Sequence, residues 1–341
     1  MADLSIKMLS AVEVDLKSQI DSIRTDRTNE IIEMMTYHMG WSGQGAGQNV
    51  SGKRLRPLFN LLSFQALLPN TASDDDWKKS LPSATAIELI HNFSLIHDDI
   101  EDNSDKRRGR ETVWKKWGIP QAINTGDAMF SLAHHAMHRL RAAFPAENVL
   151  RSTDVLLETC TQLTNGQFLD MSYETREELT VEDYWPMIEG KTAALLSSCS
   201  TIGAILSGAD EANINHMTHF GKYLGLAFQI QDDLLGIWGE ETKTGKSAAS
   251  DLLTRKKSYP ILLSLSKKAD FFDAWNKGLF VPAQIPHLTQ VMRDDGTYHE
   301  VKAKSLELTR ISLENLSACQ ITGEAGELLT TITHQLLDRE I

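Results

Sequence analysis

The sequence predicts an all-α protein, a single domain of ten or more helices. Helical periodicity recurs along most of the 341 residues, and convincing alternating strand patterns are absent. The turn-forming segments are few and short, and no stretch has the composition of a linker between domains. We therefore expect one domain that covers residues 1–341.

The predicted helices follow from the spacing of apolar residues. In residues 3–39, apolar side chains from Leu4 to Ile23 recur at intervals of three or four, which places them on one helix face. The same pattern covers residues 84–102, 121–143, 149–173, 181–207, 211–238 and 304–338. Turn-forming residues separate these segments at 41–52, 69–76, 144–148, 238–247 and 281–287.

Composition narrows the possible environments and partners. The net charge of −12 argues against a general surface for nucleic acids or anionic membranes. The three cysteines lack a metal-binding spacing, which favours free thiols in a reducing compartment. The acidic, amphipathic N-terminus is unlike a signal peptide, and no apolar run is long enough to span a membrane. We expect a cytoplasmic protein without a stable membrane anchor.

Two pairs of aspartates interrupt otherwise apolar helical segments. In HDDIEDNSDKRRGR (97–110), Asp98 and Asp102 lie one helical turn apart, and Asp99 adjoins them. In FQIQDDLLG, Asp232 and Asp233 form a second pair, and Gly236 stands where a third carboxylate would repeat the first pattern. Because clustered carboxylates repel one another and their hard oxygens suit Mg²⁺, both segments predict magnesium binding.

Basic residues gather near the ends of these acidic helices. GKRLRP (52–57) places Lys53, Arg54 and Arg56 at the start of a predicted helix, and Arg107 and Arg108 follow the first aspartates. Further basic residues are Lys191, Lys246 and Lys256. Helix N-termini and arginine side chains both favour phosphate. Metal-binding aspartates and separate cations in an apolar helical protein predict a substrate with a diphosphate and an apolar tail.

These motifs together resemble the trans-isoprenyl diphosphate synthase (polyprenyl synthetase) family. The resemblance rests on six segments between about residues 50 and 260: GKRLRP, HDDIEDNSDKRRG, GQFLD, KT at 191–192, QIQDDLLG and TGKSAASDLLTRKKSYP. It implies the isoprenoid synthase fold, with helices around a central apolar cavity, usually as a homodimer. It also implies Mg²⁺-dependent, head-to-tail condensation of isopentenyl diphosphate with an allylic diphosphate, with three Mg²⁺ ions in each active site.

The resemblance also implies roles for individual residues. The metal site would be formed by Asp98, Asp102 and Asp232 as ligands, with Asp99 and Asp233 in support. Isopentenyl diphosphate would be bound by Lys53, Arg56, His91 and Arg108. The allylic diphosphate would contact Arg107, Lys191, Gln229, Lys246 and Lys256, and the catalytic groups near the allylic cation would be Lys191, Thr192 and Gln229. Gln167 and Asp170 would line the same region.

Product length is expected to depend on the residues one turn before the first aspartates. Phe93 is five residues before Asp98 and would act as a floor for the growing chain, whereas Ser94 leaves room beside it. In the family that the sequence resembles, one aromatic residue at this position is typical of members that make geranylgeranyl diphosphate, so the resemblance implies this product, with farnesyl diphosphate as the alternative.

Other functions with similar motifs are less consistent with the sequence. A class I terpene cyclase would use the same metal chemistry but would not need GKRLRP for a second diphosphate. A head-to-head synthase would carry different acidic motifs. A non-catalytic modulatory subunit would be expected to lose aspartates, and Gly236 is the only visible gap in this chain.

Overall fold

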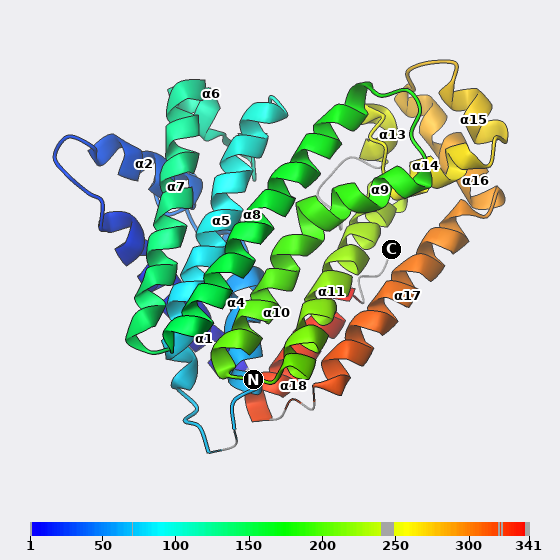
Figure 1. The fold of residues 1–341 in the computed structure, drawn as a ribbon. Helices are drawn as coiled ribbons and strands as arrows, with labels where there is room; N and C mark the ends of the chain where they lie inside the picture. Colours follow the sequence, from blue (N-terminus) through cyan, green and yellow to red (C-terminus); the bar gives the residue numbers. More distant parts are fainter. Residues whose placement is uncertain (1, 70, 240–248, 320, 322, 338–341) are drawn as a thin grey trace. The chain divides into compact units, whose positions relative to one another are not determined.

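The computed structural model describes the chain except residues 1, 70, 240–248, 320, 322 and 338–341. The described residues are almost entirely helical, and their only strands are the two short ones of a hairpin, which confirms the predicted all-α fold (Figure 1). By internal contacts the chain divides into two compact units. Unit 1 comprises Met1–Cys160, Ser198–Asn215 and Ile321–Leu329, and unit 2 comprises Thr161–Ser197, His216–Gln320 and Thr330–Ile341. The expectation of one domain stays a prediction.

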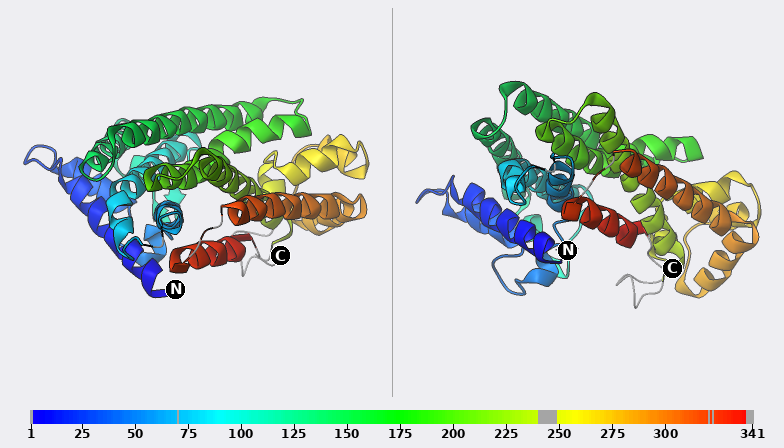
Figure 2. Two further views of the ribbon diagram at one scale, coloured as in Figure 1. Left: turned by 60° about the horizontal axis from the view of Figure 1, so that its bottom comes forward. Right: turned by 90° about the horizontal axis from the view of Figure 1, so that it is seen from below.

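Unit 1 is built around one long helix. α5 (Leu81–Glu101) packs against α1 (Ala2–Asp21), α4 (Leu55–Ala66) and α7 (Ile119–Arg139) (Figures 1 and 2). Residues 83–90 of this helix are all buried because helices surround it, so its apolar residues are not confined to one face. The shorter elements of this unit are α2 (Asn29–His38), α3 (Gln48–Ser51), η1 (Asp76–Ser80), β1 (Lys106–Arg107), β2 (Arg110–Glu111), α6 (Val113–Trp117) and η2 (Leu140–Ala142).

Unit 2 has its own apolar core. α14 (Tyr259–Ser266) packs against α9 (Val181–Ile188), α15 (Asp270–Trp275) and α17 (Thr297–Ala318). The core is formed by large buried side chains, among them Phe271, Trp275, Leu288 and Met292. The remaining short elements are η3 (Glu189–Ala193), α13 (Ser250–Thr254), η4 (Pro282–Gln284) and α16 (Ile285–Asp294).

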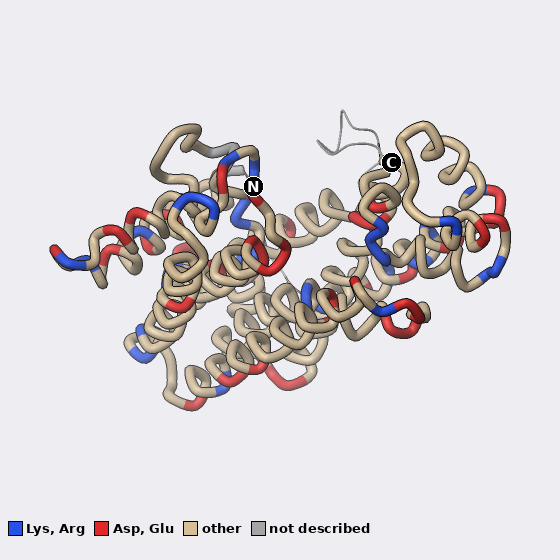
Figure 3. The backbone as a smooth tube through the Cα atoms, turned by 90° about the horizontal axis from the view of Figure 1, so that it is seen from above, with Lys and Arg blue, Asp and Glu red and all other residues tan. Residues whose placement is uncertain are grey.

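Four helices contribute residues to both units: α8 (Ala146–Thr175), α10 (Ala194–Ser207), α11 (Glu211–Trp238) and α18 (Gly323–Leu337). Long helical stretches, such as all of α10 and α14, contain no charged residue and are drawn in tan in Figure 3. Within the described residues, no helix combines the length and hydropathy that a membrane crossing requires. Cys160, Cys199 and Cys319 are buried, and none of them forms a disulfide.

The predicted helical segments match these elements, with two breaks inside them. Residues 3–39 form α1 and α2, because the polar residues between them make local hydrogen bonds instead of continuing the helix. The Ser22 hydroxyl donates to the Gln19 carbonyl, and the hydroxyls of Thr25 and Thr28 lie 2.6 Å apart. Residues 304–338 likewise fall on α17 and α18, which are separate helices.

Candidate active site

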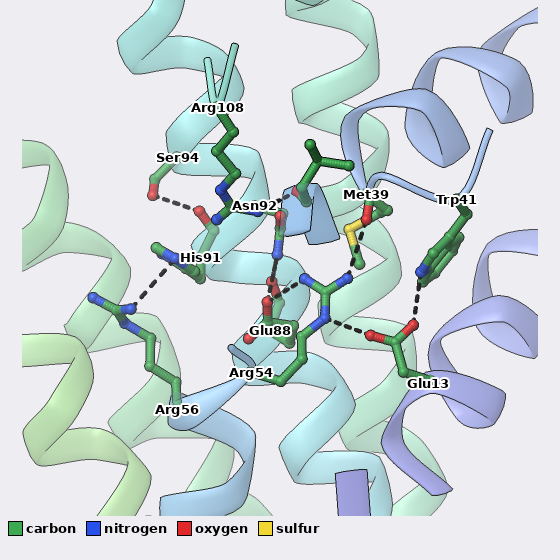
Figure 4. A network of polar contacts seen from close by, with 11 residues as sticks. Glu13, Met39, Trp41, Arg54, Arg56, Glu88, His91, Asn92, Ser94 and Arg108 are labelled. Carbon is green, nitrogen blue, oxygen red and sulfur yellow. Dashed lines mark hydrogen bonds and ion pairs between the residues drawn. The ribbon is translucent and has the colours of Figure 1, made fainter. Parts of the chain in front are cut away.

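The GKRLRP segment enters α4 through a residue in the left-handed conformation. Arg54 has φ of 48° and ψ of 38°, and its side chain is buried. Its guanidinium donates hydrogen bonds to Glu13 Oε1 at 2.7 Å, to Glu88 Oε1 at 2.8 Å and to the Met39 carbonyl at 3.3 Å (Figure 4). Arg54 is therefore held by the protein itself, whereas the neighbouring Lys53 is exposed.

Arg108 reaches the same segment from a two-residue hairpin turn. β1 and β2 pair with Arg107 opposite Arg110, and both residues of the turn have positive φ, 51° at Arg108 and 78° at Gly109. The Arg108 guanidinium donates to the Val50 carbonyl at 2.7 Å. It also fills the space beside Gly52, where a Cβ would lie 2.9 Å from its terminal nitrogens. Because Gly52 has no side chain, the guanidinium of Arg108 from the hairpin can pack directly against the GKRLRP segment.

His91 lies between two of these cations. Its Nε2 is 3.3 Å from Nη1 of Arg56, and Figure 4 shows Arg108 on its other side. Burial, and then the charges of Arg56 and Arg108, hold the pKa of His91 well below its ordinary value. Burial and the neighbouring arginines also lower the pKa of Arg108. These cations crowd one another, and an anion such as a diphosphate would relieve their repulsion.

The first aspartate motif lies at the C-terminal end of α5. The helix ends at Glu101, and the Asp102 amide still donates to the Asp98 carbonyl at 2.9 Å, so the two residues are one turn apart as predicted. Asp98 is half-buried and Asp102 is exposed. Asp99 instead is 2% exposed and accepts a hydrogen bond from Nε of Arg107 at 2.8 Å. Burial raises the pKa of Asp99, against the opposing effect of Arg107.

These carboxylates fit a divalent ion that is completed by substrate oxygens. Nowhere among the described residues do three or more His, Cys, Asp or Glu side chains form a ready-made metal site. Mg²⁺ is commonly held by one or two carboxylates together with substrate phosphates, and keeps several of its waters. Asp98 and Asp102, both at least partly exposed at the negative end of a helix dipole, provide that kind of donor set.

In unit 2, a close helix crossing brings the second group of predicted residues together. A Cβ on Gly166 of α8 would lie 2.2 Å from the Lys191 amide, so only glycine allows this approach. Lys191 and Thr192 belong to η3, a π-helical turn of a kind that often marks functional sites. The ammonium of Lys191 forms an ion pair with Asp170. The hydroxyl of Thr192 donates to Oε1 of Gln229 at 2.8 Å.

The second aspartate pair, like the first, has one buried and one more accessible member. Asp232 is half-buried, whereas Asp233 is 2% exposed. Oδ2 of Asp233 accepts from the Tyr184 hydroxyl at 2.6 Å and from the Tyr259 amide at 3.0 Å. Its Oδ1 accepts from Nε2 of Gln229 at 3.0 Å. Asp233 therefore orients Gln229, which in turn receives the hydrogen bond from Thr192.

Asp251 occupies the space that the missing side chain at Gly236 would fill. A Cβ on Gly236 would lie 2.6 Å from Oδ2 of Asp251, which is on α13. Burial disfavours the charged form of Lys256 and by itself would lower its pKa. The opposite effect of nearby carboxylates is larger, so the pKa of this lysine is raised; these carboxylates belong to Asp233, Asp251, Asp170 and Asp232. Lys256 thus lies among four carboxylates of unit 2. Lys246, the other predicted lysine, is outside the described residues.

Phe93, the predicted floor for the growing chain, belongs to a group of aromatic rings. The Phe93 ring packs edge-on against His97 of α5, with centroids 5.5 Å apart, and against Phe130 of α7, at 5.2 Å. Phe130 in turn contacts His134. The Ser94 hydroxyl donates to the His91 carbonyl, so it is engaged by its own helix.

Sequence reasoning placed the charged residues but missed several of their partners. Tyr184 and Tyr259 are distant in sequence from Asp233, to which they donate hydrogen bonds. Asp251 is likewise distant in sequence from Gly236, beside which it lies. Glu88 was visible as the one charged residue in the apolar stretch before His91, and that isolation was a usable signal. Gln167, on α8, is half-buried three residues before Asp170. No comparable signal indicated Glu13.

Comparison with known proteins agrees with this arrangement. The Polyprenyl synthetase family profile matches residues 44–277. The chain belongs to the polyprenyl synthetase family. A geranylgeranyl diphosphate synthase of Mycobacterium tuberculosis is 37% identical over 275 residues, which are 79% of this chain and 75% of that protein. A geranylgeranyl diphosphate synthase of Methanosarcina mazei is 34% identical over 292 residues, 86% of this chain and 87% of that one.

Other members of the family match either a smaller or a larger part of this chain than these two relatives do. A (2E,6E)-farnesyl diphosphate synthase of M. tuberculosis is 39% identical over 230 residues, 67% of this chain, and the match spans 61% of the length of that relative. Among solved structures, a polyprenyl synthetase from Streptomyces coelicolor A3(2) has a TM-score of 0.83 and 32% identity, covering 98% of this chain and 99% of that one. A geranylgeranyl pyrophosphate synthetase from Pyrococcus horikoshii Ot3 has a TM-score of 0.87 and 27% identity, covering 99% of each.

Proposed function

We propose that this chain condenses isopentenyl diphosphate head-to-tail with allylic diphosphates to give a short-chain all-trans prenyl diphosphate. One observation carries the proposal: unit 1 holds a group of cations around His91 in addition to the aspartates at the end of α5. Such a group suits a diphosphate bound without metal, in addition to a metal-bound one. A condensation needs two diphosphates, whereas a terpene cyclase needs one. The names of the relatives support the same reaction class.

In unit 1, the binding of isopentenyl diphosphate is assigned to Lys53, Arg56, His91 and Arg108. Arg56 and Arg108 offer charge-assisted hydrogen bonds to the phosphate oxygens. His91 remains neutral because its pKa is lowered, so it contributes a hydrogen bond and adds no further positive charge. Held by its diphosphate, isopentenyl diphosphate would have its double bond positioned for attack.

In unit 2, the residues suit departure of the allylic diphosphate. Lys191 and Lys256 would stabilise the charge that develops on it as the allylic C–O bond breaks. The oxygens of Thr192 and Gln229, linked by a hydrogen bond, would face the developing allylic cation. The C–C bond then forms with loss of one proton, which the departing diphosphate accepts. We assign no protein side chain as the base.

Magnesium is the metal we propose, because hard carboxylate oxygens and substrate phosphates are the ligands it prefers. The proposed number of three ions per active site rests on the family resemblance alone. When bound, it would neutralise charge on the departing diphosphate. Asp98, Asp102 and Asp232 are the proposed ligands, and the position of Asp251 beside Gly236 adds a fourth carboxylate. The hydrogen bonds of Asp99 and Asp233 indicate that these two support the site by holding Arg107 and Gln229.

The proposed main product is geranylgeranyl diphosphate, with farnesyl diphosphate as the alternative. Phe93 is the proposed floor for the growing chain, and its ring contact with Phe130 makes that residue part of the same barrier. The names of the relatives include both products.

A homodimer is proposed from an exposed stripe on α8. Leu150, Leu157, Phe168 and Met171 are 61%, 44%, 69% and 40% exposed, and their spacings of seven, eleven and three place them on one face. A second copy would cover this stripe. We expect Phe168→Glu to yield monomers by light scattering, whereas Leu306→Glu, at an exposed position on α17, should not. A dimer that persists in Phe168→Glu would remove this assignment.

Product analysis tests the proposed function directly. Purified protein would be incubated with Mg²⁺, isopentenyl diphosphate and, separately, dimethylallyl, geranyl or farnesyl diphosphate. The dephosphorylated products would then be sized. Metal-dependent elongation to a twenty-carbon alcohol is expected. Hydrocarbon formed from an allylic diphosphate alone would instead indicate a cyclase, and no conversion at all would favour a modulatory subunit.

A further inference from the structure

Arg54 is surrounded by acceptors from three different parts of unit 1. Glu13 comes from α1, Glu88 from α5, and the Met39 carbonyl from the end of α2 (Figure 4). The side chain of Arg54 is 4% exposed, as is that of Glu88, and the side chain of Glu13 is 28% exposed. A left-handed residue other than glycine persists only where its surroundings hold it, and this set of contacts does so.

Each of these two carboxylates also accepts a hydrogen bond from a second side chain. Oε2 of Glu13 accepts from the indole N–H of Trp41 at 2.6 Å. Oε1 of Glu88 accepts from Nδ2 of Asn92 at 2.8 Å. The guanidinium of Arg54 therefore lies between the carboxylates of Glu13 and Glu88, each of which is oriented by a second hydrogen bond. A planar guanidinium is suited to binding two such acceptors at once.

The position of Arg54 gives this network a consequence for substrate binding. Lys53 and Arg56, two proposed ligands of isopentenyl diphosphate, lie one residue before it and two residues after it in the chain. A change in the backbone at Arg54 would redirect both. Glu13 and Trp41 lie outside residues 44–277, the segment that matches the family profile. The N-terminal helix thus supplies a contact to the substrate segment that the family motifs do not include.

We propose that Glu13, through Arg54, is a positioning residue for the isopentenyl diphosphate site. Arg54 is then a support for the site and not a ligand of the diphosphate, because its charge is already matched by two carboxylates. The inference rests on the proposed function, since it takes Lys53 and Arg56 as substrate ligands. It predicts that a substitution at Glu13 of α1 weakens the binding of isopentenyl diphosphate but not that of the allylic diphosphate.

A matched control exists on the same helix. Asp15 of α1 also forms an ion pair with an arginine, Arg139, at 2.6 Å, and it accepts a hydrogen bond from Thr85. It has no contact with Arg54 among the described residues. Asp15→Asn therefore perturbs the packing of α1 through a similar loss of charge, without touching the substrate segment.

The test compares Glu13→Gln with Asp15→Asn. Gln keeps the shape of Glu13 and removes its charge, so the fold is expected to survive. In Glu13→Gln we expect KM for isopentenyl diphosphate to rise by roughly tenfold, which corresponds to about 1.4 kcal/mol. KM for the allylic diphosphate and kcat should stay unchanged. Trp41→Phe should shift KM in the same direction, because it removes the hydrogen bond that orients Glu13.

Binding measurements separate this inference from the proposed function. Calorimetry in metal-free buffer would use isopentenyl diphosphate and inorganic diphosphate as probes. Weaker binding of both by Glu13→Gln, but not by Asp15→Asn, is the expected result, even for a chain without turnover. Equal effects of the two variants, or unchanged binding in Glu13→Gln, would overturn the positioning role. Absence of elongation by the unmodified chain would overturn the proposed function instead.

Discussion

Replacing Asp233 with asparagine is expected to destabilise the protein, whereas the same replacement at Asp232 should remove activity and leave stability nearly unchanged. Asp233 is buried and accepts three hydrogen bonds, from Tyr184, Tyr259 and Gln229. Hydrogen bonds to a charged group contribute roughly 1 kcal/mol more than neutral ones, so three weakened bonds amount to about 3 kcal/mol.

The Asp233→Asn substitution also reverses a chain of hydrogen bonds. The oxygen of the introduced amide can keep the two contacts now made by Oδ2, but its nitrogen then faces the amide nitrogen of Gln229. Gln229 must turn over to accept, which presents its own nitrogen to the Thr192 hydroxyl. Thr192 can then no longer donate to Gln229, so we expect a fall in kcat beyond the loss of stability.

Urea unfolding and steady-state turnover of the two variants provide the assay. For Asp232→Asn we expect the unfolding free energy to change little and kcat to fall on the order of 100-fold, because metal binding supplies several kcal/mol of transition-state stabilisation. Asp233→Asn should lose about 3 kcal/mol of stability. If the two variants lost equal stability, the division between a half-buried proposed ligand, Asp232, and a buried support, Asp233, would be wrong.

The contacts described above lead to three more predictions. Gly236→Ala should displace the Asp251 carboxylate, because a Cβ would lie 2.6 Å from Oδ2; we expect weaker Mg²⁺-dependent binding of inorganic diphosphate by calorimetry, with unchanged binding in the absence of metal. Burial lowers the pKa of His38 from 6.5 to about 3, so below pH 6.5 the unfolded chain binds more protons and stability falls as the pH is lowered. At pH 5 the resulting loss of unfolding free energy is at most about 2 kcal/mol, and the partial exposure of the side chain reduces it to about 1 kcal/mol. Denaturant unfolding should show a weaker dependence of stability on pH in His38→Gln. An unchanged pH dependence in this variant would contradict the assignment. Phe93→Ala and Phe130→Ala should each lengthen the product alcohol, and an unchanged product distribution in both would remove the aromatic floor.

Much of the fold followed from the spacing of apolar residues, because buried helix faces leave a strong pattern. α5, α8 and α11 lie close to their predicted ranges. The break between α1 and α2 was missed because it depends on local hydrogen bonds of Ser22 and Thr25, which do not alter the apolar spacing. The hairpin at Arg108 was missed because two-residue strands are too short to show alternation.

Predicting the site depended on a different kind of information. Asp98 and Asp102 were placed one turn apart correctly, since that geometry is local to one helix. The separate surroundings of Asp99 and Asp233 were beyond a local pattern, because they arise from Arg107 and Tyr184 through tertiary packing. The metal and substrate roles of all these residues remain predictions.

The π-helical turn at Glu189–Ala193 has a consequence for how the chain tolerates insertions and deletions. A π turn holds one residue more than an α-helical turn, so every residue after it is rotated by about 100° relative to an uninterrupted helix. Gly221 lies close to the Leu196 carbonyl, since a Cβ there would lie 2.6 Å away, so a rotation of the start of α10 would disturb this contact. Loss of a single residue in the turn would rotate α10 out of register with α11.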